Sequence, residues 1–162
     1  MERVEKPFTY LWYPDAGELP EEDLALLEEA RKATRLAYAP YSGFRVGAAL
    51  ALVSGDVVTG ANQENASFPA GLCAERVALA GAAARFPGVA VAALAVSYDA
   101  GQGAGDRPIS PCGICRQSLA EWEQRFESPM RIILGGQTGG VQVIESASML
   151  LPLSFSREDL PG

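Results

Sequence analysis

The sequence predicts an α/β fold, a three-layer α-β-α sandwich around a mixed five-stranded sheet. The chain has 162 residues, about the length of one domain, and 48% of them are hydrophobic, which suffices for a packed core. Hydrophobic patterns typical of helices and strands follow one another in the order helix, strand, strand, helix, strand, helix, strand, strand. We therefore expect a single domain over residues 20–162, preceded by an irregular extension over residues 1–19.

The first helix and the first two strands follow from short local signals. Pro20 and three acidic residues precede apolar residues at helical spacing, and Pro40 ends this pattern, so a helix is predicted between the two prolines. Residues 44–53 have the composition of a strand. Residues 57–61 form its expected hairpin partner, with Ser54-Gly55-Asp56 as the turn.

The second half of the chain predicts two helices and three strands. Residues 73–85 are rich in alanine and have no interior proline, which favours the first of these helices. Residues 89–97 are almost wholly apolar, which favours a buried strand. Serine followed by proline is a good start for the second helix. The expected elements are a helix over 73–85, a strand over 89–97, a glycine-containing loop over 98–110, a helix from Ser110-Pro111 to about Phe126, and strands over 130–134 and 141–145.

Charge and composition exclude several classes of function. With 13 Lys and Arg against 20 Asp and Glu, the net charge is −7, the wrong sign for a protein that binds a polyphosphate backbone or an anionic membrane surface. Residues 1–10 are rich in charge instead of forming an apolar signal segment, and no long uncharged apolar run follows. We expect a soluble, cytoplasmic protein that binds neither nucleic acid nor membranes.

The chain contains no histidine, which excludes imidazole bases and ligands, so its three cysteines become the candidate metal ligands. Cys112 and Cys115 lie three residues apart at a predicted helix start, where the helix dipole favours thiolates. This pair alone fits a redox dithiol, half of a metal site or two inert cysteines. Cys73 begins another predicted helix, two residues before Glu75. Catalytic zinc takes three protein ligands and a water molecule, so the three cysteines together predict zinc with one open position.

Several separated motifs occur in order along the chain. They are YAPYSGFRVGAA at 38–49, NQENAS at 62–67, CAER at 73–76, PCGICRQ at 111–117 and LLPLSF at 150–155. These motifs resemble the zinc-dependent nucleoside and nucleobase deaminases, in particular the small cytidine deaminases whose zinc ligands are all cysteines, over about residues 19–160. The resemblance implies hydrolytic deamination of cytidine and 2′-deoxycytidine to uridine and 2′-deoxyuridine plus ammonia, in pyrimidine salvage, with one Zn²⁺ per subunit.

The resemblance also implies roles in the metal site. Cys73, Cys112 and Cys115 would bind the zinc ion. Glu75 would be the catalytic proton shuttle between the attacking hydroxide, N3 of the ring and the departing ammonia. Arg76 would donate hydrogen bonds to ligand sulfur atoms and offset the negative charge of three thiolates.

Substrate-binding roles follow from the same resemblance. Asn62 and Glu64 would hold the 3′-hydroxyl of the sugar, Phe44 would pack against the pyrimidine ring, and Ala74 would contact the substrate. Phe155 matches a C-terminal aromatic residue that the family inserts into the site of a neighbouring subunit. The implied assembly is therefore a homotetramer.

One departure from the family and three alternative functions accompany this prediction. Phe68 stands where the family often has tyrosine, so a hydroxyl contact from that position is absent. A blasticidin S-type or other small-molecule zinc aminohydrolase would share the zinc motifs. A zinc-stabilised interaction module would tolerate loss of the Glu75 carboxylate, and a redox dithiol protein would need no zinc.

Overall fold

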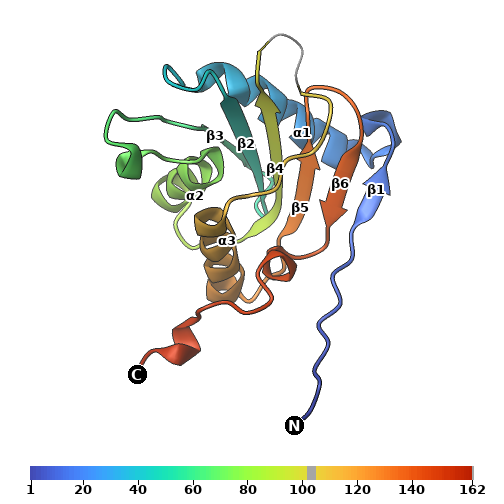
Figure 1. Cartoon of the computed structure of the whole chain (residues 1–162), viewed down its shortest axis with the longest axis vertical. Coiled ribbons are helices and arrows are strands. Elements are labelled where there is room, and N and C mark those ends of the chain that lie inside the picture. Colours follow the sequence, from blue (N-terminus) through green and yellow to red (C-terminus); the bar gives the residue numbers. More distant parts are fainter. Residues whose placement is uncertain (102–104, 162) are drawn as a thin grey trace.

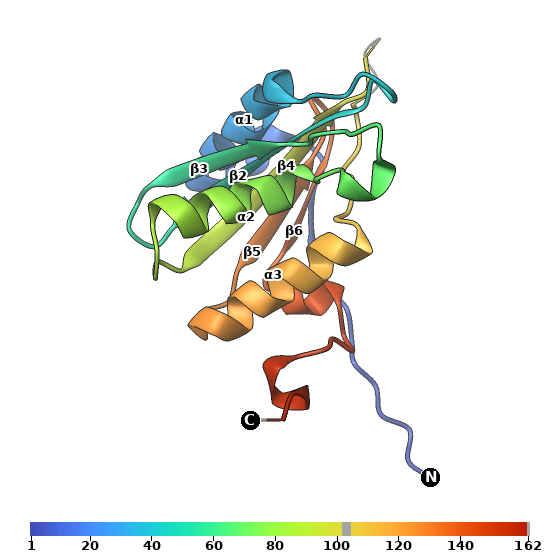
Figure 2. The same cartoon turned by 90° about the vertical axis from the view of Figure 1, so that its left-hand side faces the viewer.

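The computed structural model describes residues 1–101 and 105–161 and has the three layers that the sequence predicts. Within these residues, six strands form a sheet in the order β1-β6-β5-β4-β2-β3. Helix α1 covers one face of the sheet, and helices α2 and α3 cover the other (Figure 1 and Figure 2). The strands are β1 (Leu11–Tyr13), β2 (Arg45–Leu52), β3 (Val57–Ala61), β4 (Val91–Asp99), β5 (Arg131–Gly135) and β6 (Val141–Ile144), and the α-helices are α1 (Glu21–Ala33), α2 (Ala74–Arg85) and α3 (Gly113–Phe126). Short 3₁₀ helices are η1 (Ala16–Glu18), η2 (Thr34–Leu36), η3 (Phe68–Ala70), η4 (Ala147–Leu150) and η5 (Arg157–Asp159).

The sheet is mixed, as predicted. Strand β2 pairs antiparallel with β3 and β4, and β5 pairs antiparallel with β6. Strands β4 and β5 are parallel, and α3 lies in the connection between them. Parallel neighbours require such a crossover, which carries the chain back across one face of the sheet.

The number of strands differs from the predicted five. Leu11–Tyr13, within the extension that was predicted to be irregular, form β1 and pair antiparallel with residues 141–143 at the edge of the sheet. A strand of three residues whose first two side chains are exposed produces no alternating pattern, so the sequence carried no signal for it. Trp12 packs over Gly140, where an added Cβ would lie 2.4 Å from the indole ring. The domain boundary at residue 20 stays a prediction.

Two hydrophobic clusters fill the spaces on either side of the sheet. Ala30 of α1 packs with Ala95 of β4 in one cluster, and Ala78 of α2 packs with Val96 of β4 in the other. Neighbouring residues of β4 therefore face opposite layers, as the period of a strand requires. Gly60 on β3 allows α2 to lie directly on the sheet, because a Cβ at that position would be 2.4 Å from the backbone nitrogen of Ala78. This close approach fixes the position of α2 over the sheet.

Both helices on the α2 and α3 face begin just after a cysteine. Cys73 is the N-cap residue of α2, which starts at Ala74, and Cys112 is the N-cap residue of α3. The predicted start of α3 at Ser110-Pro111 is therefore two residues too early. An N-cap residue keeps an extended backbone, which lets its side chain turn away from the helix.

Other boundaries also differ from the prediction, most of them by one or two residues. The first α-helix ends at Ala33, and the chain continues as the tighter 3₁₀ helix Thr34–Leu36. Strand β4 extends to Asp99 and so includes the start of the predicted loop over 98–110. Residues 102–104 of that loop lie outside the described residues.

Candidate metal centre and substrate pocket

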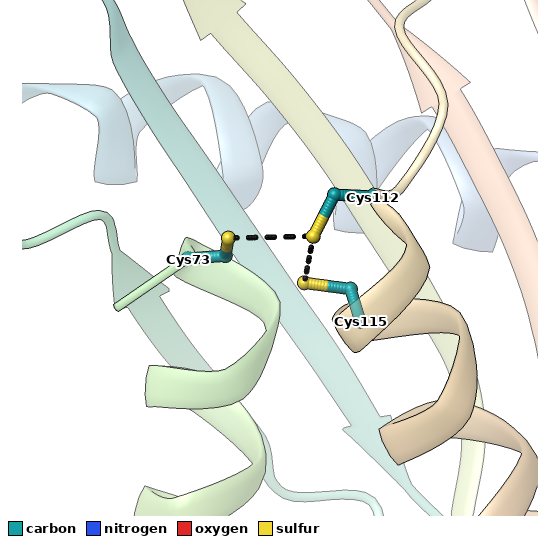
Figure 3. Close-up of side chains that lie close together, drawn as sticks. All are labelled: Cys73, Cys112 and Cys115. Atoms are coloured by element: carbon teal, nitrogen blue, oxygen red, sulfur yellow. Dashed lines mark hydrogen bonds between the residues drawn. The ribbon is translucent and has the colours of Figure 1, made fainter. Parts of the chain in front are cut away.

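Cys73, which is distant in the sequence, lies together with Cys112 and Cys115 where α2 and α3 begin (Figure 3). The Sγ atoms of Cys73 and Cys112 are 3.7 Å apart, and those of Cys112 and Cys115 are 3.5 Å apart. All three sulfur atoms lie within 4.8 Å of one another. The structure thus brings together the three residues that the sequence predicted as metal ligands.

This set of sulfur atoms fits a zinc ion. Tetrahedral zinc binds cysteine sulfur at about 2.3 Å, which places the sulfur atoms about 3.8 Å from each other. The Cys73–Cys112 and Cys112–Cys115 separations are close to that value. Among the described residues the cluster has three potential ligands, whereas a structural zinc site has four. Cys115 is buried and Cys112 is exposed, so one side of the cluster faces solvent, where a water molecule can complete the coordination.

The surroundings of the cluster favour thiolates. The N-termini of α2 and α3 each place about half a positive charge beside the sulfur atoms. A hydrogen bond from Cys115 is the main reason that the pKa of Cys73 is lowered to about 6, with smaller contributions from Cys112 and Arg76 and opposition from burial and Glu75. The same hydrogen bond raises the pKa of Cys115, and burial adds to this effect. In the thiol form of the cluster, Cys73 therefore ionises before Cys115.

Glu75 lies in the first turn of α2, two residues after Cys73, and is only 4% exposed. Burial raises the pKa of its carboxyl group, while hydrogen bonds from its own backbone N–H and from Cys115 act in the opposite direction. A buried carboxyl group with a raised pKa exchanges protons more readily near neutral pH than an exposed one. Glu75 therefore has the environment of a general acid and base.

Arg76 is half-buried and follows Glu75 in the first turn of α2. Its positive charge helps to lower the pKa of Cys73. The hydrogen bonds to cysteine sulfur that the resemblance implies are not formed in the described part of the chain, where the sulfur atoms contact each other. The effect of Arg76 on the cluster is electrostatic in this structure.

A pocket of about 470 Å³ opens beside Cys73. Its walls come from the turn before β2, the segment after β3 and the segment that leads into α2. The lining residues are Tyr41, Ser42, Asn62, Gln63, Glu64, Asn65, Phe68, Gly71, Leu72 and Cys73. The pocket thus contains one candidate metal ligand together with both residues predicted to bind the sugar, and its volume suits a small molecule.

The turn before β2 holds the Glu64 carboxylate. Oε2 of Glu64 accepts the N–H groups of Tyr41 at 2.8 Å and of Ser42 at 3.3 Å, and Oε1 accepts the hydroxyl of Ser42. These hydrogen bonds, that from the Ser42 hydroxyl first, lower the pKa of Glu64, so the carboxylate is ionised at neutral pH. An oriented carboxylate has lone pairs left to accept hydrogen bonds from sugar hydroxyls.

Asn62 fixes the backbone from the carbonyl of Phe44 to the N–H of Val46. Its Oδ1 accepts the N–H of Val46 at 2.7 Å, and its Nδ2 donates to the carbonyl of Phe44 at 2.9 Å. The Ser42 hydroxyl oxygen accepts the N–H of Phe44 at 3.0 Å. The ring of Phe44 stacks on that of Tyr98, with centroids 5.1 Å apart and planes inclined by 23°. Phe44 is therefore held in one orientation, although it is not among the residues that line the pocket of the single chain.

Two residues of this network, Ser42 and Tyr98, were missed by the sequence analysis. The Ser42 hydroxyl connects Glu64 to Phe44, and only its place within the 38–49 motif pointed toward it. Tyr98 meets Phe44 because it pairs with Val46 in the register of β2 and β4. A single sequence contains no signal for that register.

The other two predicted substrate-binding residues, Ala74 and Phe155, and the departing position Phe68 lie in different environments. Ala74 is fully buried between Cys73 and Glu75 at the start of α2. Phe68 lines the pocket, contacts the ring of Tyr41 edge to face and is 76% exposed. Phe155 is 60% exposed and is not among the residues that line the pocket of its own chain.

The fold and the site together define a class of protein, the zinc-binding enzymes built on an α-β-α sandwich whose metal ligands lie at the N-termini of two helices. Residues 20–126 match the family model described as the cytidine and deoxycytidylate deaminase zinc-binding region. The chain belongs to this deaminase family. Its zinc-binding region is the one that contains the three clustered cysteines.

Known relatives agree with this assignment. The chain is 42% identical to a cytidine deaminase of Halalkalibacterium halodurans over 137 residues, which cover 83% of this chain and 95% of that protein. It is 35% identical to a cytidine deaminase of Mycobacterium tuberculosis over 147 residues, 88% of this chain and 97% of the relative. The crystal structure of a cytidine deaminase from Burkholderia pseudomallei, 41% identical, matches with a TM-score of 0.70 and covers 85% of this chain and 100% of its own. The predicted family and fold class are confirmed, with six strands in place of five.

Proposed function

We propose that this protein catalyses the zinc-dependent hydrolytic deamination of cytidine and 2′-deoxycytidine to uridine and 2′-deoxyuridine, with release of ammonia. The observation that carries the proposal is the position of the buried Glu75 beside the three-cysteine cluster, next to a pocket that contains Glu64. Family membership supports the same reaction. A redox dithiol protein or a zinc-stabilised interaction module would have no use for the buried carboxyl group.

The pocket favours a nucleoside over a nucleotide. Among the described residues, its lining includes the ionised Glu64 and no lysine or arginine. A phosphate group at the sugar end would meet a negative charge without a cation to balance it, and the net charge of −7 adds to this repulsion. Because the 3′-hydroxyl is common to ribose and deoxyribose, we expect both nucleosides to be substrates.

In the proposed reaction, Glu75 moves protons between water, the ring and the leaving group. Cys73, Cys112 and Cys115 would hold a zinc ion, which would lower the pKa of a water molecule so that it can act as the nucleophile at neutral pH. Glu75 accepts one proton from this water and donates it to N3 of the ring, which makes C4 electrophilic. After the C4–O bond forms, Glu75 carries the second proton from the new hydroxyl group to the amino nitrogen. The C4–N bond then breaks, ammonia leaves, and the ring has the N3–H and C4 carbonyl of uridine.

Residues in and near the pocket orient the substrate. The Phe44 ring, supported by Tyr98, offers an apolar surface to the pyrimidine. The Glu64 carboxylate accepts the 3′-hydroxyl, and Asn62 has a second amide hydrogen besides the one that binds the Phe44 carbonyl. Since these groups are already held by their own chain, little ordering is needed when the substrate binds.

For the assembly, we propose a homotetramer with shared active sites that acts in cytoplasmic pyrimidine salvage. Large apolar side chains near the pocket and the C-terminus are exposed in the single chain, among them Phe68 at 76%, Leu153 at 87% and Phe155 at 60%. Exposed apolar patches of this kind are typical of interaction surfaces, and a second copy of the chain would cover them. Within the described residues, none of the helices combines the length and apolar character needed to cross a membrane.

The decisive experiment follows the ultraviolet absorbance of zinc-loaded protein incubated separately with cytidine, 2′-deoxycytidine, deoxycytidylate and blasticidin S. Glu75→Gln with an equal zinc content is the control. We expect the aminopyrimidine absorbance to be lost for the two nucleosides, and kcat of Glu75→Gln to fall roughly 10² to 10⁴-fold, the effect of removing a general acid and base. If only blasticidin S is turned over, the reaction type stands and blasticidin S replaces the two nucleosides as the substrate. If the zinc-loaded protein turns over none of the four compounds, the proposal is contradicted.

A further inference from the structure

Two motifs that the proposed mechanism does not use lie in contact, one at the start of α3 and one near the C-terminus. Arg116 donates from Nε to the carbonyl of Pro111 at 2.9 Å and from Nη1 to the carbonyl of Leu150 at 3.1 Å. Gln117 donates from Nε2 to the carbonyl of Phe155 at 2.8 Å. The first turn of α3 therefore binds the C-terminal segment, residues 150–155, at both of its ends.

The same arginine also belongs to the metal-binding turn. Arg116 follows Cys115 directly, and the buried Pro111 directly precedes Cys112. A guanidinium group is planar, with its donors in a fixed arrangement. Two hydrogen bonds from the Arg116 guanidinium therefore fix the positions of the Pro111 and Leu150 carbonyl groups relative to each other. Movement of Leu150 away from α3 would disturb the Arg116 guanidinium, and this guanidinium holds Pro111, the residue before Cys112.

Apolar packing holds the start of the C-terminal segment and little of the rest. Leu150 is buried in the hydrophobic core at 6% exposed. Further along α3, Glu123 anchors the preceding residues by accepting the N–H groups of Ala147 at 2.8 Å and Ser148 at 2.9 Å. Beyond Leu150, Leu153 is 87% exposed and Phe155 is 60% exposed. Within the described residues, side-chain hydrogen bonds from Gln117 and from Lys6 of the N-terminal extension hold Phe155 and Pro152.

We propose that Arg116 and Gln117 are positioning residues that couple the metal site to the C-terminal segment. Zinc at the three cysteines orders the first turn of α3, and that turn holds residues 150–155 in place. Coupling of two sites is reciprocal, so an ordered segment also slows the loss of zinc. The inference rests on the zinc site of the proposed function, and it makes the placement of Phe155 depend on bound zinc.

The first measurement is hydrogen exchange of the full-length protein, with zinc bound and after removal of zinc by a chelator. Backbone amides of Met149 and Leu151, which donate to Ser146 and Ser148, report on the start of the segment, and peptides over 150–155 report on the rest. We expect removal of zinc to speed exchange there by roughly tenfold, within the usual range of coupling between two sites. Light scattering of both samples separates this effect from a change in assembly.

The second measurement is the rate at which variants release zinc to a chromogenic chelator. Arg116→Met removes both hydrogen bonds, Arg116→Lys keeps the charge but not the paired donors, and Gln117→Ala removes only the bond to Phe155. Arg85→Met, at the end of α2 where the arginine lies over the ring of Phe86, is the matched control. We expect Arg116→Met and Arg116→Lys to release zinc roughly tenfold faster than the parent, Gln117→Ala to do so to a smaller extent, and Arg85→Met to match the parent.

Two results would overturn the coupling: exchange over 150–155 that does not depend on zinc, or parental zinc release by Arg116→Lys. If Arg116→Met does not fold, the exchange of the parent and the behaviour of Arg116→Lys and Gln117→Ala still decide the question. None of these readouts needs turnover. A protein that binds zinc but deaminates nothing would therefore refute the proposed function without affecting this test.

Discussion

The Glu64 carboxylate illustrates, at the scale of single residues, how the chain prepares its substrate pocket. Tyr41 and Ser42 orient this carboxylate through hydrogen bonds, and the same bonds keep it ionised. Ser42 also accepts the N–H of Phe44, so the predicted sugar-binding and ring-binding residues belong to one network. Such preorganisation lowers the entropy lost when a substrate binds.

Replacement of Glu64 by Gln tests this role with little change in size. We expect KM for cytidine to rise roughly tenfold to a hundredfold while kcat changes much less, as for the loss of a hydrogen bond to a charged group. Hydrogen bonding to Ser42 lowers the pKa of Glu64, so its carboxylate stays ionised from neutral pH down to the ordinary carboxyl range. The contribution of Glu64 to cytidine binding should therefore stay constant over that range. 2′,3′-Dideoxycytidine, which lacks the hydroxyl, is the control and should have the same KM in both proteins. An unaltered KM for cytidine would exclude Glu64 from sugar binding.

Arg76 gives a second prediction at this scale. Three thiolates around a divalent ion leave one excess negative charge, which weakens the ability of the metal to acidify water. The Arg76 charge acts in the opposite direction, as its effect on the pKa of Cys73 shows. We expect Arg76→Gln to lower kcat by roughly tenfold, at the lower end of the usual effect of changing a group beside metal ligands, while zinc content by metal analysis stays the same. Unchanged kinetics would remove Arg76 from the reaction.

Residues of the site differed in how far the sequence could predict them. The cysteines could be found because no histidine competes as a ligand and because Cys112 and Cys115 have a local spacing. The backbone contacts of Asn62 and the stacking of Tyr98 on Phe44 depend on the register of β2 with its neighbours. Register follows from tertiary packing, so a single sequence does not reveal it.

At the scale of elements, the site depends on how closely α2 lies against β3. Gly60→Ala would place a Cβ 2.4 Å from the Ala78 nitrogen and 2.6 Å from the Ala74 carbonyl oxygen, both of them backbone atoms that cannot rotate away. We expect a loss of about 1–3 kcal/mol in the free energy of unfolding, the usual effect of overpacking, and weaker zinc binding because Ala74 adjoins Cys73. Thermal unfolding and competitive zinc titration measure the two effects.

Gly81→Ala, within α2, is the matched control for this prediction. Its nearest neighbour would be a side-chain carbon of Val58 at 3.4 Å, and alanine stabilises a helix interior by about 0.5–1 kcal/mol relative to glycine. We therefore expect Gly81→Ala to be as stable as the parent or slightly more so. Equal stability of Gly60→Ala and Gly81→Ala would show that the close packing of α2 on β3 is not needed.

The sequence predicted elements with long hydrophobic patterns better than it predicted short ones. The three α-helices and five of the strands produce periodic or wholly apolar runs, and the structure contains all of them. β1 was missed because Leu11 and Trp12 are exposed at the sheet edge. The start of α3 was placed too early because Ser110-Pro111 is a good cap signal, whereas the structure uses Cys112, which orients the sulfur atom toward the cluster.

At the scale of the whole molecule, Phe155 is the residue that one chain alone does not explain. It is 60% exposed, lies outside the pocket of its own chain and is held through its carbonyl by Gln117. The ring is therefore presented outward on a fixed backbone. In a homotetramer with shared sites, Glu75 of one subunit would work with Phe155 of another.

Complementation between two defective variants tests this arrangement. Glu75→Gln retains Phe155 but lacks the proton shuttle, and Phe155→Ala retains Glu75 but lacks the ring, so each alone should have a low kcat/KM for cytidine. When the two are co-expressed with different tags and the mixed assembly is purified, an intact site forms wherever a Phe155→Ala subunit receives the ring from a Glu75→Gln subunit. We expect its activity to exceed the average of the two pure variants by roughly tenfold, as for an aromatic side chain whose loss costs 1–2 kcal/mol. Activity equal to that average, or a monomeric mass for the parent by light scattering, would contradict shared sites and would limit the role of Phe155 to its own chain.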